Sequence, residues 1–172
     1  MNFTITSTEP NSSARTGTLK TFHSQIETPV FMPIGTSGAV KTLLPKDLYD
    51  VKTTIILGNT YHLFLRPGHD LIHRCGGLHK FMNWGKSILT DSGGFQVYSL
   101  AKLNKISDEG VKFQSHIDGS NHFITPEISM EIQRSLGSDI IMAFDVCPPG
   151  EATKETVISA VDQTTKWIKR CK

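Results

Sequence analysis

The sequence has no long apolar run. The longest strictly apolar stretch, residues 140–144, has five residues, whereas a helix that crosses a membrane requires about 18 or more. Residues 1–7 also lack the basic start and the apolar stretch of a secretory signal. We therefore expect a protein that does not enter a membrane and that stays in the cytoplasm.

Cysteine is scarce, and neither sign of charge is in large excess. Cys75, Cys147 and Cys171 lie far apart in the sequence, so neither a disulfide framework nor a short cysteine pair for a metal is expected. The net charge of +2 gives only weak attraction to polyanions, so charge alone does not predict a nucleic-acid partner. The seven histidines form neither an HxH nor an HExxH motif, which favours solvated or structural roles for them.

The chain has 172 residues, of which 38% are hydrophobic and 20% are charged. This composition is typical of a packed protein and argues against a disordered polymer. The length fits one domain, or part of a larger one.

The apolar pattern changes near residue 29. Residues 1–28 alternate polar and apolar positions around a turn cluster at residues 10–13, which predicts an N-terminal β-hairpin region. From residue 29 the apolar runs are short and continuous, as in strands buried on both faces of a parallel sheet. Four such runs stand out: residues 30–34, 54–57, 87–90 and 139–144.

Helical patterns lie between and after these runs. They cover residues 45–51, 67–75, 126–136 and 152–171. The third is the clearest, because Thr125 can cap it, Pro126 suits its first position and Gly137 follows its end. The alternation of strands and helices predicts an α/β fold with parallel strands, in either an open sheet or a barrel.

One insertion interrupts the alternation of strands and helices. Residues 111–117 alternate apolar and polar side chains, and the Asp118-Gly119 pair precedes a return through residues 122–124. Aspartate followed by glycine is a strong turn signal between two strands. The segment is therefore predicted to be an inserted β-hairpin.

Polar side chains follow the ends of the predicted parallel strands. Asn59 follows the second run, Asp91 the third and Asp145 the fourth. Ligands gather at the carboxyl ends of strands in open sheets and in barrels alike, so we expect these side chains to converge on one site. In the alternative interpretation, Asp91 is a turn former before glycines and Asp145 a cap or turn residue before Pro148.

The residues that follow Asp91 suit a planar heterocycle. Gly93 and Gly94 allow a ligand close to the backbone and leave amide donors free, Phe95 offers a stacking face and Gln96 offers a paired donor and acceptor. The sequence has no phosphate-loop motif. Ser92 lacks the G-x-S-x-G frame of an activated nucleophile and an obvious histidine base.

Five strings of residues are similar to those of one family. They are TPVFMPIGT at 28–36, LGNTYHL at 57–63, LRPG at 65–68, TDSGGFQ at 90–96 and MAFD at 142–145. In this order and spacing, the chain from about residue 14 onward resembles the queuine tRNA-ribosyltransferase family, also called tRNA-guanine transglycosylase.

This resemblance implies a (β/α)8 barrel of the TIM type. It assigns residues 1–28 to an N-terminal β-hairpin region and residues 29–172 to the incomplete first part of the barrel, so that the chain corresponds to an N-terminal half with an inserted β-hairpin. The implied activity is a pentosyl transfer that exchanges guanine at the tRNA wobble position for a 7-deazaguanine, queuine or its precursor, in queuosine modification of tRNA. The implied partners are the anticodon loop of tRNA and the deazaguanine base, and a homodimer is compatible with the resemblance.

The resemblance also implies roles for individual residues. Asp91 matches the aspartate that transfers protons, and Asp145 the residue that accepts hydrogen bonds from the purine edge. The other substrate-binding positions implied are Phe95 as the stacking ring, Ser92, Gln96, Gly93 and Gly94 as the pocket lining, and Asn59 near the ribose.

Other parts of the family's site are absent from the sequence. The nucleophilic aspartate, the glycine-rich segment and the zinc subdomain belong to the later part of the family's chain. The sequence contains no CxCxxC string, so the zinc of the full-length family has no ligands here. Two alternatives stay open: a non-catalytic, truncated or partner-dependent binding subunit, and a nucleoside or sugar hydrolase that uses Asp91 and Asp145 directly.

Overall fold

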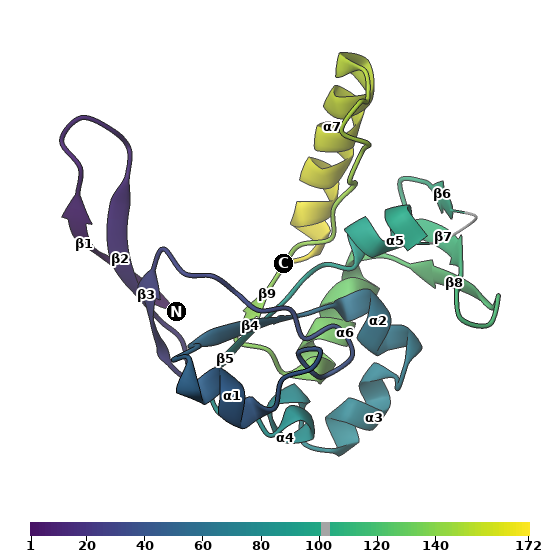
Figure 1. The fold of residues 1–172 in the computed structure, drawn as a ribbon. Coiled ribbons are helices and arrows are strands. Elements are labelled where there is room, and N and C mark those ends of the chain that lie inside the picture. The colour runs from purple at the N-terminus through teal and green to yellow at the C-terminus, as the bar shows by residue number, and fades with distance from the viewer. Residues whose placement is uncertain (101–103) are drawn as a thin grey trace.

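The computed structural model describes residues 1–100 and 104–172. Short helices surround a small parallel sheet, and two antiparallel sheets extend from it (Figure 1). The α/β class predicted from the sequence is confirmed at this level. Within the described residues the parallel strands do not close into a barrel. No described helix combines the length and the hydropathy needed to cross a bilayer.

The N-terminal region is an antiparallel sheet of three strands. Its strands are β1 (Asn2–Thr8), β2 (Arg15–Lys20) and β3 (Gln25–Thr28), in the order β1-β2-β3. Every residue of β1 is exposed, and β1 and β2 extend away from the other elements (Figure 1). The sequence predicted a hairpin here, and β3 adds a third strand because Gln25–Thr28 pairs with Gly17–Lys20.

The central sheet is parallel and contains β4 (Ile55–Gly58), β5 (Ser87–Thr90) and β9 (Ile140–Ile141), in the order β4-β5-β9. The register places Gly58 beside Thr90. The predicted strands at 54–57 and 87–90 are therefore confirmed. The one at 139–144 is reduced to two residues.

The predicted strand at residues 30–34 is wrong in its extent. Only Ile34 bridges to Leu57, with Leu57 N donating to Pro33 O at 2.9 Å. Proline at 29 and 33 cannot donate a backbone hydrogen bond, which limits the pairing of this segment. Its residues are also not buried on both faces, since Phe31 is 82% exposed.

Helix α6 (Pro126–Leu136) forms as its sequence predicts. Thr125 accepts a hydrogen bond from Ile128 N, and Gly137 ends the helix with a left-handed φ of 72°. The predicted helices at 45–51, 67–75 and 152–171 appear as α1 (Pro45–Asp50), α3 (His69–Arg74) and α7 (Lys154–Arg170). Three further helices were not predicted from the sequence: α2 (Thr60–Leu65), α4 (Leu78–Met82) and α5 (Gly94–Leu100).

The inserted hairpin is confirmed. Strands β7 (Val111–Gln114) and β8 (Asn121–Ile124) pair antiparallel, and β6 (Asn104–Ile106) adds a third strand beside β7. Gly119 takes the left-handed conformation that the turn requires, with φ of 74°. The apolar core lies between the parallel sheet, α2, α3, α6 and α7, and its largest fully buried side chains are Trp167, Tyr61 and Phe144.

Candidate active site

Asp91 lies at the carboxyl end of β5 and is held by groups from the end of β4. Asn59 Nδ2 donates to Asp91 Oδ2 at 2.5 Å, and Thr60 N donates to Oδ1 at 2.9 Å. Gly93 N also donates to Oδ1, at 3.1 Å. These contacts follow from the parallel register, which aligns the ends of β4 and β5. The two predicted site residues Asn59 and Asp91 are therefore in direct contact.

Burial raises the pKa of Asp91, although hydrogen bonds from Asn59, Thr60, Gly93 and Gln96 oppose the shift. Desolvation disfavours the charged carboxylate, because little water surrounds it. A carboxyl group with a raised pKa takes up a proton more readily than an ordinary aspartate and can still release it, which suits a group that transfers protons.

Asp145 reaches the same strand end from the segment after β9. Ser92 Oγ donates to Asp145 Oδ1 at 2.6 Å and accepts from Gly94 N at 3.1 Å. A Cβ atom at Gly94 would lie 2.5 Å from Asp145 O and 2.8 Å from Asp145 Oδ1. Only glycine permits this approach. Asp145 therefore contacts the residue that directly follows Asp91.

A small cavity lies beside Asp145 and is lined mainly by apolar residues of α5, β6 and the segment 145–147. Asp91 is not among the residues that line it. Burial, and then the nearby Asp145 charge, raise the pKa of the Cys147 thiol in this lining. The thiol therefore stays protonated, as expected for a packing role rather than for a nucleophile.

Phe95 and Gln96 lie in the first turn of α5. Phe95 is 56% exposed, so its ring is accessible to a planar group. Among the described residues, Gln96 Oε1 is a buried oxygen without a hydrogen-bond partner. Such an atom is costly to bury unless something binds it, which makes it a ready acceptor for a ligand.

His62 lies in α2 near Asp91 and was not predicted as a site residue from the sequence. Burial lowers the pKa of His62, repulsion from His116 lowers it further, and attraction to Asp91 opposes both. Its imidazole is therefore kept neutral beside the site. The LGNTYHL string contained His62, but a single histidine without a motif gave no independent signal.

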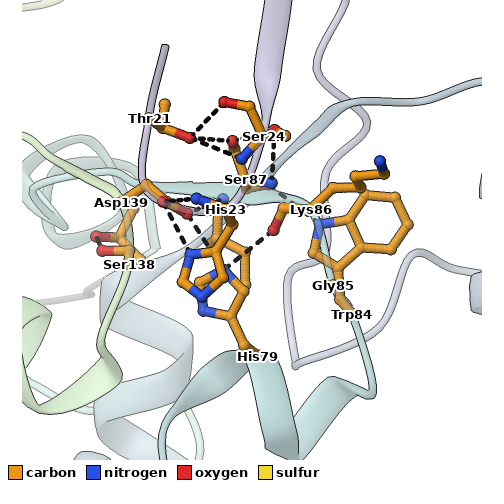
Figure 2. Close-up of polar contacts among 12 residues, drawn as sticks. Thr21, His23, Ser24, His79, Trp84, Gly85, Lys86, Ser87, Ser138 and Asp139 are labelled. Atoms are coloured by element: carbon orange, nitrogen blue, oxygen red, sulfur yellow. Dashed lines mark hydrogen bonds and ion pairs between the residues drawn. The ribbon is translucent and has the colours of Figure 1, made fainter. Parts of the chain in front are cut away.

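A second polar cluster lies at the opposite, amino end of the parallel strands (Figure 2). Asp139 Oδ1 accepts from His23 Nδ1 at 2.9 Å, and Asp139 Oδ2 lies 3.2 Å from His79 Nε2. Backbone donors complete the carboxylate, since His23 N donates to Oδ1 and Ile88 N to Oδ2. The two imidazole rings stack with their centroids 3.6 Å apart.

These three side chains are placed like metal ligands, since their ligand atoms lie within 4.8 Å of one another. The hydrogen bonds argue for a different role. His79 Nε2 is 3.0 Å from Lys86 O, and a carbonyl oxygen can only accept, so this nitrogen carries a proton and has no lone pair for a metal. The cluster is therefore a hydrogen-bonded clamp that joins the turn before β3, helix α4 and the start of β9.

Comparisons with known proteins agree on one family. A family model described as "TGT: Queuine tRNA-ribosyltransferase" matches residues 10–172. A queuine tRNA-ribosyltransferase of Fusobacterium nucleatum is 60% identical over 163 residues, which are 95% of this chain and 44% of that protein. Proteins of the same name from Pelotomaculum thermopropionicum and Caldanaerobacter subterraneus are 55% and 56% identical over all of this chain and 46% of their own length. The chain thus spans less than half the length of these relatives.

Proposed function

The chain belongs to the queuine tRNA-ribosyltransferase family, and from this premise we propose that it supplies the first part of a tRNA-guanine transglycosylase site. The reaction replaces guanine at the tRNA wobble position with a 7-deazaguanine, queuine or its precursor. The observation that carries the proposal is the contact of Asn59 with Asp91 and of Ser92 with Asp145 at one strand end.

Asp91 is proposed to move the proton. When the glycosidic bond breaks, the bond from C1′ to a carboxylate oxygen forms, and the departing guanine must gain one proton. When the incoming base replaces that carboxylate, this base must lose one proton. A single carboxyl group of raised pKa serves both steps. The nucleophilic carboxylate is assigned to the part of the relatives that lies beyond this chain.

Asp145 is proposed to select the purine by accepting hydrogen bonds from adjacent N–H donors on its edge. Its Oδ1 already accepts from Ser92, and each carboxylate oxygen can accept more than one hydrogen bond. The remaining substrate contacts proposed are stacking by Phe95, a hydrogen bond accepted by Gln96 Oε1, and a contact of Asn59 near the ribose. Ser92, Gly93 and Gly94 are proposed to line the pocket and not to supply free amide donors, because Gly93 N already donates to Asp91 and Gly94 N to Ser92.

The larger architecture is part of the proposal. The parallel order β4-β5-β9 fits the first part of a (β/α)8 barrel over residues 29–172, with residues 1–28 as a separate N-terminal region. The partners proposed are the anticodon loop of tRNA and the free base, with a homodimer as the assembly and the cytoplasm as the location.

The zinc of the full-length family does not fit the residues of this chain. Among the described residues, the one group with the spacing of metal ligands contains no cysteine.

The test is an exchange assay on a completed protein, in which this chain is joined to the C-terminal part of one of its relatives. Radiolabelled guanine should be incorporated into tRNA by the completed protein and not by residues 1–172 alone, because the nucleophile is missing from the shorter chain. Incorporation by residues 1–172 alone would contradict the proposed division of the site. Hydrolysis of free nucleosides without tRNA would favour the hydrolase alternative, and binding without exchange by the completed protein would favour the non-catalytic one.

A further inference from the structure

Helix α6 carries two buried polar side chains on the face that meets the parallel strands. Ser129 and Gln133 are one helical turn apart, and both are 0% exposed. Buried polar side chains are costly unless they are hydrogen-bonded, so their partners show what this face of the helix holds in place.

Gln133 binds the backbone just before Asp145. Its Oε1 accepts from Met142 N at 2.9 Å, and its Nε2 donates to Met142 O at 2.8 Å. The side-chain amide therefore fills the place of a neighbouring strand directly after β9 ends. Only one orientation of the amide fits, because the reverse would set oxygen against oxygen and N–H against N–H.

The same two side chains also bind the segment that contains Asp91. Thr90 Oγ1 donates to Gln133 Oε1 at 3.0 Å, and Ser129 Oγ donates to Ser92 O at 2.9 Å. Gln133 Nε2 further donates to Ser129 Oγ at 3.3 Å. Two residues of one rigid helix thus hold the residues on both sides of Asp91.

We propose that Gln133 and Ser129 are positioning residues that fix the carboxyl group of Asp145 relative to that of Asp91. Both side chains are fully buried and hydrogen-bond to Met142, Thr90 and Ser92. The inference rests on the proposed function, because it assigns these residues to the geometry of that site. A displacement of about 1 Å between reacting groups can cost on the order of 100-fold in rate, so loss of either contact is expected to lower catalysis more than it lowers folding.

The first variant is Gln133→Met in the completed protein, which keeps the volume and removes the hydrogen bonds. We expect kcat for guanine exchange to fall by about 10- to 100-fold, with the KM for tRNA unchanged. The control is Ile132→Ala, which removes a fully buried apolar side chain from the same helix. This control should lower the thermal midpoint at least as much and leave kcat within about two-fold of the parent protein.

A second variant, Gln133→Glu, keeps the shape of the side chain and tests the proposal even if Gln133→Met does not fold. A protonated glutamic acid reproduces the two bonds to Met142, since its O–H can donate to Met142 O and its carbonyl can accept from Met142 N, and it loses only the longer bond to Ser129 Oγ. Burial raises the pKa of such a group, so kcat relative to the parent protein should rise as the pH falls from 8 to 6. Ser129→Ala removes the donor to Ser92 O and the acceptor of one Gln133 N–H, but it leaves both bonds from Gln133 to Met142 in place. It should therefore give a smaller loss of kcat than Gln133→Met.

The outcomes separate the two proposals. If the parent completed protein shows no exchange, the proposed function fails and the positioning role fails with it. If the parent protein exchanges guanine but Gln133→Met and Ile132→Ala lower kcat equally, the two residues only stabilise the fold and the positioning role is overturned. A relative kcat of Gln133→Glu that does not change with pH would likewise overturn it.

Discussion

Each end of the parallel sheet holds an aspartate with little access to water, and the two differ in how far hydrogen bonds offset the cost of burying the charge. At the carboxyl end, burial raises the pKa of Asp91 despite its hydrogen bonds. At the amino end, the Asp139 side chain is also buried, but hydrogen bonds from Ile88 N and His23, with the attraction of the His23 ring, outweigh burial and lower its pKa. The comparison teaches that the balance of donors, rather than depth alone, decides whether a buried carboxylate can exchange protons or only hold segments together.

The largest effect should come from Asp91→Asn in the completed protein. The substitution keeps the shape and removes the proton carrier, so guanine exchange should fall by about 10²- to 10⁴-fold. The thermal midpoint should not fall, because the cost of burying this charge disappears and the Asn59 amide can rotate so that its oxygen accepts from the new NH₂ group. Asp70→Asn, at a side chain 80% exposed, is the matched control and should change neither quantity. Undiminished exchange by Asp91→Asn would remove the proton role.

Asp139→Asn should show the opposite pattern. One oxygen becomes an NH₂ group that faces donors, so a buried backbone N–H or an imidazole loses its acceptor. A loss of about 3 kcal/mol in the free energy of unfolding is expected, measured by urea denaturation. The kcat of the fraction that remains folded should stay near that of the parent protein. A large loss of kcat without a loss of stability would show that the amino end of the sheet takes part in catalysis.

The smallest predicted effect is on the stability of the fold at acid pH. Burial, and then repulsion from His23, lower the pKa of His79, so the unfolded chain binds the proton more readily, and stability should fall as the pH drops below about 6.5. The stability contributed by the lowered pKa of Asp139 is present above the ordinary value of 3.8 and is lost only as the pH falls below it. Asp91 changes stability in the opposite direction. Because its pKa is raised, the charged carboxylate lowers the free energy of unfolding, and this loss disappears as the pH falls through that pKa.

His79→Gln tests this difference between the two ends. Urea midpoints at pH 7.5, 6.5 and 5.5 should decline less steeply for this variant than for the parent protein. His73→Gln changes an exposed histidine of α3 and should leave the slope as it is. Equal slopes for the parent protein and for both variants would mean that the clamp does not govern the acid response.

Local signals predicted the elements that local contacts determine. Helix α6 follows its capping threonine and its terminal glycine, and the hairpin of β7 and β8 follows its Asp118-Gly119 turn. Helix α5 was missed because a start at Gly94 has no sequence signal. Its place depends on the segment around Asp145, which is distant in the sequence.

The site was predicted in part for the same physical reason. Asp91, Asn59 and Asp145 each follow an apolar run, so the convergence of strand ends was visible in the sequence. The clamp was not, since His23 and Asp139 are 116 positions apart and neither belongs to a motif. Gln133 was missed because a glutamine in an amphipathic helix gives no sign that it will face the core.

The close approach of Gly94 to Asp145 limits which amino acids can replace this glycine. A methyl group there would overlap the backbone of Asp145, so random replacement at this codon should yield glycine alone among functional clones. At Gly150, where an added Cβ meets nothing within 4 Å, the same procedure should tolerate most amino acids. Two glycines in one chain thus mark the extremes of mutational freedom.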